Sequence, residues 1–536
     1  MLFNSSTFLL GFLPGVFAGF CVLSFSRFKQ FAGLWLTVAS LLFYAWWRPE
    51  GLPILVVSAV ANYLVAGQLI RRRNQPLLLA AIFANLAALA YYKYAGFLTV
   101  VANEAFGSDL IVPQIVLPLA ISFFTFQQIA YLVDASDGEV EEHSFSNYCL
   151  FLTFFPHLIA GPITHHREML SQFRDPDRFR PRLDLFAVGT TLFLMGLFKK
   201  VIVADGFATT VRPIFATAAS QGVQTVEAWA GTLSYTLQIY FDFSGYSDMA
   251  IGLGLMFGIS LPINFNSPLK ARNIIEYWAR WHMTLTRFLT AYIYNPMVVA
   301  LTRRRARQGY PLPRRGKTTL GAFATLVALP TMVTLFISGV WHGAGWQFVI
   351  FGLLHGTYLV IANGWRAWKT HRGLPERSGN PIVVAGSVLT TFLAVVVGLV
   401  FFRSPDVPTA VGILGSMIGL HGTTLPLPAG HLPGVPALAN ALGMNIGSLD
   451  LVDVKSIARI LLFLAVVWAL PNSHQWLGNY PTALGFQARQ NAMERIVPLL
   501  RWKPHPAVGL TFGAVSMVTL LYAISAAPSE FIYFHF

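Results

Sequence analysis

The chain has 536 residues, of which 55% are hydrophobic and 11% are charged, and its mean hydropathy is +0.58. Because a soluble domain carries about 25% charged residues, this composition excludes an ordinary soluble protein and indicates a polytopic membrane protein. The formal net charge of +14 does not predict nucleic-acid binding, because the basic residues gather in short loops between apolar segments. Such loops are topology signals that stay on the cytosolic side.

The apolar segments predict about twelve transmembrane helices. They lie near residues 7–25, 31–47, 53–70, 77–100, 113–133, 184–204, 228–258, 319–340, 343–363, 382–402, 456–470 and 507–526. We read the first segment as a retained span, because no basic region precedes it and no small-residue cleavage motif follows. Residues 145–163 have two flanks that both look cytosolic, the acidic Asp134–Glu142 and the basic His165–Arg182, so we expect a re-entrant or buried segment there. The sequence therefore predicts an all-α fold with additional re-entrant or interfacial helices.

The loop charges predict how the chain is oriented. Arg71–Arg73, Arg303–Lys317 and Arg366–Arg377 are basic and should be cytosolic, whereas Ser404–Asp453 has almost no Lys or Arg and should be an outer loop. This alternation places both termini on the outer side. The two cysteines, Cys21 and Cys149, lie in apolar segments, so we expect neither a disulfide framework nor a metal site.

Two aspartates lie inside the apolar segment 234–258. Asp242 and Asp248 would each cost about 2.5–3.5 kcal/mol at the bilayer centre, so they should face protein or water. They lie about 120° apart on a helix, which argues against a paired acid and base. The nearby Gly245 and Gly252 would allow close helix contact, and polar contacts between helices explain this segment as well as chemistry does.

Two histidines lie where water should be scarce. With Lys270–Tyr294 taken as one helix, His282 falls in the middle of its apolar face. His342 lies in the Gly-rich stretch 338–346 between two spans, where a titratable ring needs a partner or a wet cavity. Each also has a structural alternative, which is an interfacial ring for His282 and a turn-stabilising ring for His342. On one continuous helix, His355 would lie roughly 20 Å from His342, so we expect it to be structural.

Several motifs occur in a fixed order along the chain. They are Asp242-Phe-Ser-Gly-Tyr-Ser-Asp, Asn264-Phe-Asn, Tyr277-Trp-Ala-Arg-Trp-His282, Trp341-His342-Gly-Ala-Gly-Trp and Gly352-Leu-Leu-His355-Gly. This series resembles the membrane-bound O-acyltransferase family, in its bacterial branch that includes alginate O-acetyltransferase. The resemblance implies a single membrane-embedded acyltransferase domain that encloses a tunnel. Its parts would be N-terminal helices (1–230), a catalytic core (231–363) and C-terminal helices (364–536).

The resemblance also implies an activity and roles for residues. A neutral imidazole can take the proton of a hydroxyl as that hydroxyl attacks a thioester carbonyl. The resemblance assigns this general-base role to His342, and we expect His282 to polarise the thioester or the oxyanion. We expect Trp281 and Trp341 to shape the tunnel, and Asp242 and Asn264 to contribute to substrate binding. The acyl group, with acetyl favoured, would pass from a cytosolic thioester to a hydroxyl of an exported polysaccharide or cell-envelope glycan.

No tightly bound cofactor is implied, and the donor would be acetyl-CoA or an acyl carrier thioester. Expected partners are membrane lipid, the polysaccharide acceptor, and a periplasmic SGNH-type acetyltransferase or an acyl carrier protein. The expected location is the bacterial inner membrane. The alternatives are a D-alanyl transferase of a cell-wall polymer and a non-enzymatic transporter or scaffold subunit of an export system. Inverted repeats, which are typical of transporters, are not found in the sequence.

Overall fold

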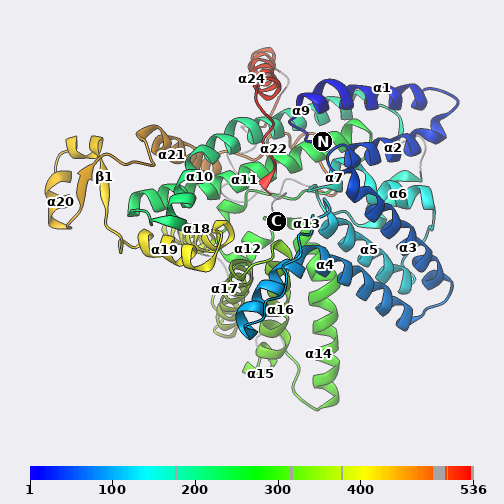
Figure 1. The fold of residues 1–536 in the computed structure, drawn as a ribbon, viewed down its shortest axis with the longest axis horizontal. Helices are drawn as coiled ribbons and strands as arrows, with labels where there is room; N and C mark the ends of the chain where they lie inside the picture. Colours follow the sequence, from blue (N-terminus) through cyan, green and yellow to red (C-terminus); the bar gives the residue numbers. More distant parts are fainter. Residues whose placement is uncertain (175–178, 314–317, 376–377, 487–500, 504, 533–536) are drawn as a thin grey trace. The chain divides into compact units, whose positions relative to one another are not determined.

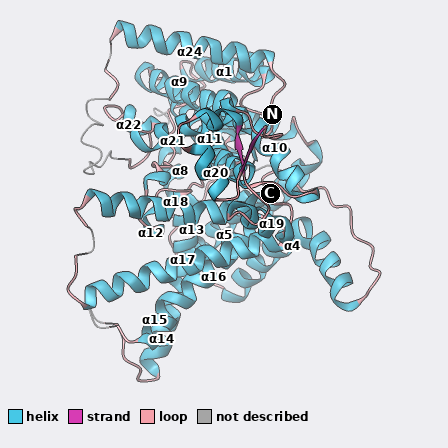
Figure 2. Cartoon of the chain, turned by 90° about the vertical axis from the view of Figure 1, so that its left-hand side faces the viewer, coloured by secondary structure: helices cyan, strands magenta, loops and turns pink. Residues whose placement is uncertain are grey.

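A computed structural model describes residues 1–174, 179–313, 318–375, 378–486, 501–503 and 505–532. Figure 2 shows that this part is mainly helical, with one short pair of strands. The helical content confirms the predicted all-α class, since a helix satisfies all of its backbone groups within one membrane-crossing segment. The predicted tunnel is not tested by the helix arrangement and stays a prediction.

The chain divides into two compact units, each assembled from segments that are distant in sequence. Unit 1 comprises Met1–Ile202, Phe243–Asn264 and Ser473–Phe536, and unit 2 comprises Val203–Asp242 and Phe265–Asn472. The boundary falls inside the long helix α11 (Thr225–Met256), which contributes its first part to unit 2 and its second part to unit 1. The predicted division at residues 230 and 363 stays a prediction.

Figure 1 follows the elements along the sequence, with η denoting 3₁₀- and π-helices. Unit 1 contains η1 (Thr7–Phe12), α1 (Leu13–Ser24), η2 (Lys29–Phe31), α2 (Ala32–Ala45), η3 (Pro49–Gly51), α3 (Leu52–Arg71), α4 (Gln75–Phe106), α5 (Ile121–Ser136), α6 (Phe145–Thr153), α7 (Phe155–Leu158), α8 (His166–Phe173), α9 (Leu183–Phe198), α22 (Ser473–Trp476) and α24 (Pro506–Ser525). The π-helix η5 (Lys199–Ala204) crosses the boundary between the units.

Unit 2 holds the remaining elements. They are α10 (Asp205–Ser220), η6 (Pro268–Lys270), α12 (Ile274–Trp278), α13 (Met283–Leu289), η7 (Thr290–Tyr294), α14 (Asn295–Arg307), α15 (Leu320–Phe323), η8 (Ala324–Ala328), α16 (Leu329–His342), α17 (Trp346–His371), α18 (Pro381–Arg403), α19 (Val407–Met417), β1 (Thr424–Pro426), η9 (Leu427–His431), α20 (Val435–Ala441), β2 (Asn445–Gly447) and α21 (Val454–Ala469).

Eight helical stretches of the described chain are long and apolar enough to cross a membrane. They are Thr7–Ser24, Pro49–Arg71, Gln75–Phe106, Leu183–Ser220, Leu320–His342, Trp346–His371, Pro381–Arg403 and Pro506–Ser525. Each coincides with a predicted span. The other four predicted spans contain helices as well, but α2, α5 and α21 are too short and α11 is too polar to qualify. The count of twelve therefore stays a prediction.

In unit 1, α9 and α11 pack backbone against backbone through glycines. A Cβ atom added to Gly189 would lie 2.5 Å from the carbonyl oxygen of Gly252, and one added to Gly245 would lie 2.8 Å from that of Gly196. Any larger residue at these positions would push the helices apart. The predicted close helix contact at Gly245 and Gly252 is confirmed.

In unit 2, α16 and α17 form a hairpin around the turn 343–345. The two helices approach closely, because a Cβ atom on Gly339 would meet the carbonyl oxygen of Phe348 and one on Gly352 would meet that of Leu335. Helix α17 packs in turn against α18. Since α16 ends at His342, this hairpin determines where the histidine lies.

The prediction of one amphipathic helix over Lys270–Tyr294 is wrong. The stretch is divided into η6, α12, α13 and η7, with a break between Trp278 and Met283. The side chain of Asn273 caps the start of α12 by accepting a hydrogen bond from the Glu276 amide. His282 then adopts a left-handed backbone conformation, which a continuous helix cannot contain. The prediction failed because it applied the 3.6-residue helical periodicity across His282, which is not helical.

The predicted outer loop Ser404–Asp453 contains more structure than a loop. Helices α19 and α20 lie in it, and β1 pairs in parallel with β2, with Thr424 opposite Asn445. The abundant Pro and Gly residues concealed these short elements, since they interrupt any periodic pattern.

Candidate active site

His282 occupies the break between α12 and α13 in unit 2. Its backbone has φ 44° and ψ 50°, a left-handed conformation that residues with a Cβ atom rarely adopt. Its side chain is fully buried. Strained backbone at a buried polar residue is costly, and such strain gathers at functional sites. No sequence pattern predicts this conformation.

His342 is the last residue of α16 and is buried by aromatic rings. Its imidazole packs edge-on against Phe351 of α17, with ring centroids 5.9 Å apart, and against Phe402 of α18, with centroids 5.1 Å apart. The glycines that bring α16 close to α17 are therefore responsible for the position of this ring. Three helices hold His342 in place.

Trp341 brings the two histidines into one cluster. Its indole lies 6.2 Å from the His282 ring and 4.9 Å from the His342 ring, measured between centroids. All three residues are buried and belong to unit 2. The structure thus gathers the two histidines predicted to be catalytic with a tryptophan predicted to shape a tunnel. Their roles in the reaction stay predictions.

Trp281, the second predicted tunnel residue, lies in an aromatic layer beside this cluster. Its indole stacks on Tyr277 at 5.8 Å and meets Phe265 edge-on at 5.0 Å. The layer continues to His355, whose ring lies 5.4 Å from that of Trp278. The side chains around Trp281 are therefore mainly apolar surfaces, which exclude water.

The expected separation of His355 from His342 is wrong. The chain turns back at 343–345, so the two residues are not on one helix, and both rings contact Phe351. His355 is buried, and neither of its ring nitrogens has a hydrogen-bond partner among the described residues. A Cβ atom on Gly398 would collide with this ring, so the imidazole lies directly on the backbone of α18.

Burial determines the protonation state of His282, which lies outside the eight candidate spans. Removing the ring from water penalises its charged form and lowers the pKa of His282 to about 3. At neutral pH the imidazole is therefore uncharged. A neutral ring can accept a proton, or donate one hydrogen bond to an oxygen that develops negative charge.

Two further predicted residues lie on or beyond α11. Asp242 is buried in the part of α11 that belongs to unit 2. Asn264 belongs to unit 1, where it is fully buried and its amide nitrogen donates to Ser247 Oγ at 3.4 Å. Their predicted contribution to substrate binding stays a prediction.

Comparisons with known proteins decide the family. A family model for the membrane-bound O-acyltransferases matches residues 111–308. The peptidoglycan O-acetyltransferase of Helicobacter pylori is 39% identical over 460 residues, which cover 79% of this chain and 81% of that protein. The chain belongs to the membrane-bound O-acyltransferase family. It is thus a multi-pass membrane protein and an O-acyltransferase, as the order of its motifs predicted.

Two other relatives show how far the similarity of this acyltransferase extends. The probable alginate O-acetylase of Pseudomonas aeruginosa is 36% identical over 420 residues, covering 76% of this chain and 73% of that protein. The teichoic acid D-alanyltransferase of Streptococcus thermophilus is 26% identical over 293 residues, covering 53% of this chain and 68% of that protein. The similarity to the acetyl-transferring relatives is both higher and longer.

Unit 1 of the acyltransferase contains a buried charged network that sequence reasoning did not assemble. Asp248 Oδ2 lies 2.6 Å from Lys199 Nζ and accepts a hydrogen bond from Ser473 Oγ at 2.5 Å, while Asp248 Oδ1 lies 3.3 Å from His474 Nε2. His474 Nδ1 is bonded in turn to Thr482 at 3.0 Å. The network joins η5, α11 and α22. The sequence signal that could have suggested this network is the presence of two charged residues, Lys199 and Asp248, within apolar segments.

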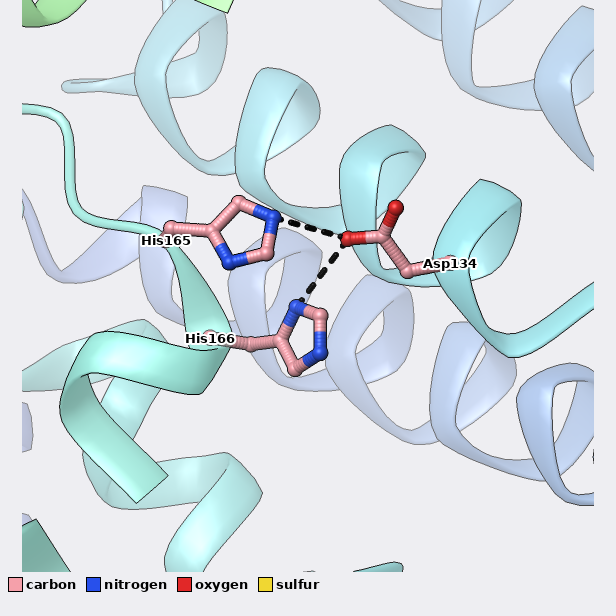
Figure 3. A group of neighbouring side chains, drawn as sticks. All are labelled: Asp134, His165 and His166. Atoms are coloured by element: carbon pink, nitrogen blue, oxygen red, sulfur yellow. Dashed lines mark ion pairs between the residues drawn. The ribbon is translucent and has the colours of Figure 1, made fainter. Parts of the chain in front are cut away.

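A second polar cluster in unit 1 has donor atoms suited to a metal ion. Figure 3 shows His165 and His166 facing Asp134 of α5, with His165 Nε2 at 3.0 Å and His166 Nδ1 at 3.2 Å from the same carboxylate oxygen. His165 Nδ1 accepts the amide hydrogen of Arg167, which puts the ring proton on Nε2, the atom that faces Asp134. A metal ion would have to displace that proton. The arrangement fits a carboxylate that accepts two imidazole hydrogen bonds, and we assign it a structural role.

Proposed function

We propose that this acyltransferase moves an acetyl group from a cytosolic thioester to a hydroxyl of an exported polysaccharide or cell-envelope glycan. Acetyl is supported by the relatives that match most of the chain, which are named peptidoglycan O-acetyltransferase and alginate O-acetylase. Those names also support an acceptor outside the cytosol. The multi-pass fold supports a reaction whose donor and acceptor lie on opposite sides of the membrane.

One observation carries the catalytic part of the proposal, which is the convergence of His282 and His342 on Trp341. Two imidazoles that share one aromatic neighbour inside a dry cluster can act on the same substrate. His282 is neutral because it is buried. The aromatic rings around both histidines exclude water that would otherwise hydrolyse the thioester.

In the proposed reaction, His342 accepts the proton of the acceptor hydroxyl as its oxygen attacks the thioester carbonyl carbon. The carbonyl oxygen gains negative charge in the tetrahedral intermediate, and the neutral His282 donates a hydrogen bond to it. The carbon–sulfur bond then breaks, and the thiolate leaves with the proton from His342 as a free thiol. The products are an O-acetyl ester and the thiol of the donor.

The proposal is tested with purified protein in neutral-lipid nanodiscs, an acetyl thioester and a glycan acceptor, with mass spectrometry of the product. His342→Ala should abolish acetyl transfer, and His282→Ala should lower it by 10²-fold or more. His421→Ala is the matched control, because His421 lies in the outer segment and bonds only locally to Ser416. Wild-type transfer by a folded His342→Ala protein would show that the base is another group.

A D-alanyl transferase of a cell-wall polymer is the second candidate. The similarity to teichoic acid D-alanyltransferases supports it. The same assay separates the two functions when acetyl and D-alanyl thioesters compete for one enzyme sample. Preferential transfer of D-alanine would replace the first proposal with the second.

We further propose that the protein lies in the bacterial inner membrane with both termini on the periplasmic side, which the distribution of basic loops supports. The donor is acetyl-CoA or an acyl carrier thioester. A periplasmic SGNH-type acetyltransferase is the proposed partner when the acceptor lies beyond the reach of the membrane site.

A further inference from the structure

The last residue of α18, Arg403, is held against two aromatic rings of unit 2. Its guanidinium carbon lies 5.2 Å from the ring centroid of Phe215 on α10 and 5.9 Å from that of Tyr235 on α11. These two rings contact each other, with centroids 6.0 Å apart. Contact with aromatic faces holds a guanidinium in place and leaves its N–H groups available for other partners.

The hydrogen-bonding capacity of Arg403 is unused within the described part of the chain. Its guanidinium has five N–H donors but forms no hydrogen bond and no ion pair with a described residue. Asp406 follows three positions later, but its Oδ1 accepts the amide hydrogen of Thr409 at 2.8 Å and so caps α19. Because Arg403 is half-buried, its charge is partly removed from water, and such a charge gains most from an anionic partner.

A second arginine of unit 2 provides a direct contrast. Arg459 of α21 also lies over an aromatic ring, with 5.7 Å from its guanidinium carbon to the centroid of Phe207. Its Nη1 atom, however, donates to the carbonyl oxygen of Gly206 at 2.6 Å, which ties α21 to α10. Arg459 therefore has a structural role, whereas no bond of this kind accounts for Arg403.

The end of α18 lies beside the proposed base. Phe402, the residue before Arg403, packs on the His342 ring with centroids 5.1 Å apart. Gln347 Nε2, near the start of α17, donates to the carbonyl oxygen of Pro405 at 3.0 Å, which ties the end of α18 to the hairpin that carries His342. Consecutive Cα atoms are only about 3.8 Å apart, so Arg403 can hold an acceptor close to His342.

The charge around Arg403 also favours an anion. In the proposed orientation, α18 leads from the cytosolic loop Arg366–Arg377 to the outer segment Ser404–Asp453, so Arg403 lies on the acceptor side. Residues 407–449 of that segment contain no Asp, Glu, Lys or Arg. This stretch therefore adds no carboxylate that would repel an anionic ligand.

We propose that Arg403 recognises the acceptor by binding a carboxylate of the glycan whose hydroxyl is acetylated. The inference rests on the proposed function and narrows its acceptor to an anionic, carboxylate-bearing glycan. A guanidinium presents two parallel N–H groups to a carboxylate, and this charged pair is stronger than a hydrogen bond to a neutral amide. The Phe215 and Tyr235 rings limit the freedom that the guanidinium loses when a ligand binds.

Binding is measured by calorimetry without an acyl donor, using the full-length protein in phosphatidylcholine nanodiscs. The ligands are a short oligouronide and the same oligosaccharide with its carboxylates converted to carboxamides. The wild type should bind the oligouronide roughly tenfold more tightly, and Arg403→Gln should remove this difference. Arg403→Lys keeps the charge but loses the paired donors, so it should retain only part of the difference, and it decides the test if Arg403→Gln does not fold. Arg459→Gln is the matched control and should discriminate like the wild type.

The outcomes separate this proposal from the proposed function. Equal affinity of the wild type for the two ligands, or full discrimination by Arg403→Gln, would overturn the role of Arg403. Acetyl transfer to both ligands with equal KM leads to the same conclusion, and the proposed function then stands. Arg403-dependent binding of the oligouronide by a protein that transfers no acetyl group would support the site and contradict the proposed function. Retention of phosphatidylglycerol that depends on Arg403, with no effect on the oligouronide, would identify a lipid-headgroup site and overturn the proposal.

Discussion

The imidazole of His282 lies 6.2 Å from the indole of Trp341, with the ring planes inclined by 57°. The two residues are 59 positions apart in the sequence numbering, and one lies at a broken helix while the other lies in the last turn of α16. Because of this contact, the backbone conformation of His282 determines where its ring lies relative to Trp341.

The left-handed backbone of His282 predicts a difference between glycine and alanine at this position. His282→Gly should be more stable than His282→Ala by roughly 1 kcal/mol, because glycine adopts φ 44° without a steric penalty. Both variants should lose acetyl transfer, since both lack the imidazole. Thermal unfolding in one detergent measures the difference. Equal or reversed stabilities would show that the left-handed conformation is not strained.

The buried position of His282 predicts a pH effect on stability. The pKa of His282 is about 3 in the folded protein against an ordinary value of 6.5, so the unfolded chain binds a proton between these values that the folded chain does not. Stability should therefore fall as the pH drops below 6.5, by up to about 1.4 kcal/mol per pH unit from this residue. His282→Gln should show a shallower decline in melting temperature from pH 6.5 to pH 4.5. Parallel curves for the two proteins would contradict a buried neutral ring.

The ion pair between Asp248 and Lys199 in unit 1 predicts that substitutions of these two residues have non-additive effects on stability. Asp248→Ala leaves the largely buried ammonium of Lys199, whose side chain is 15% exposed, without its 2.6 Å carboxylate partner, and should destabilise the protein by about 3 kcal/mol. Lys199→Met should be similarly harmful. The double variant should cost clearly less than the sum of the two, because it leaves neither charge alone. Thr482→Val, at the outer end of the network, is a milder control, and additive effects would indicate that the pair does not interact.

The basic loops predict a topology that labelling can measure. Single cysteines at Gln308 and Gly373 should be protected from an impermeant maleimide in intact cells with a permeabilised outer layer, in a background that lacks Cys21 and Cys149. A single cysteine at Gly430 should be labelled. Residues 314–317 of the first loop and 376–377 of the second lie outside the described part of the structure. Labelling at Gln308 from outside would invert the orientation.

The hydrogen-bonded cluster around Asp134 predicts that metal removal has no effect on stability. Asp134→Asn should destabilise the protein, because an amide cannot accept both imidazole hydrogen bonds as strongly as a carboxylate does. Treatment with a chelator should leave the melting temperature of the wild type unchanged. Stoichiometric zinc by elemental analysis, lost in Asp134→Asn, would instead establish a metal site.

Composition and the order of motifs were sufficient for the membrane class, the helical fold and the family, because each depends on residue types along the chain. The eight helices that can cross a membrane are long apolar runs, and hydropathy detects such runs locally. The close contact at Gly245 and Gly252 was also predictable, since the lack of a side chain is itself the property that allows the approach.

Tertiary structure alone decided how the functional side chains are placed. The sequence pattern predicted one helix over residues 270–294, but the left-handed conformation of His282 interrupts it. Periodicity carries no information about a single backbone angle, so it could not predict this interruption. The turn at 343–345 likewise folds α16 back on α17 and so brings His342 to Phe351, the ring that also contacts His355. The Asp248 network depends on residues more than 200 positions apart. Such contacts arise from how helices pack, and packing depends on the whole set of side chains that must fill one interior.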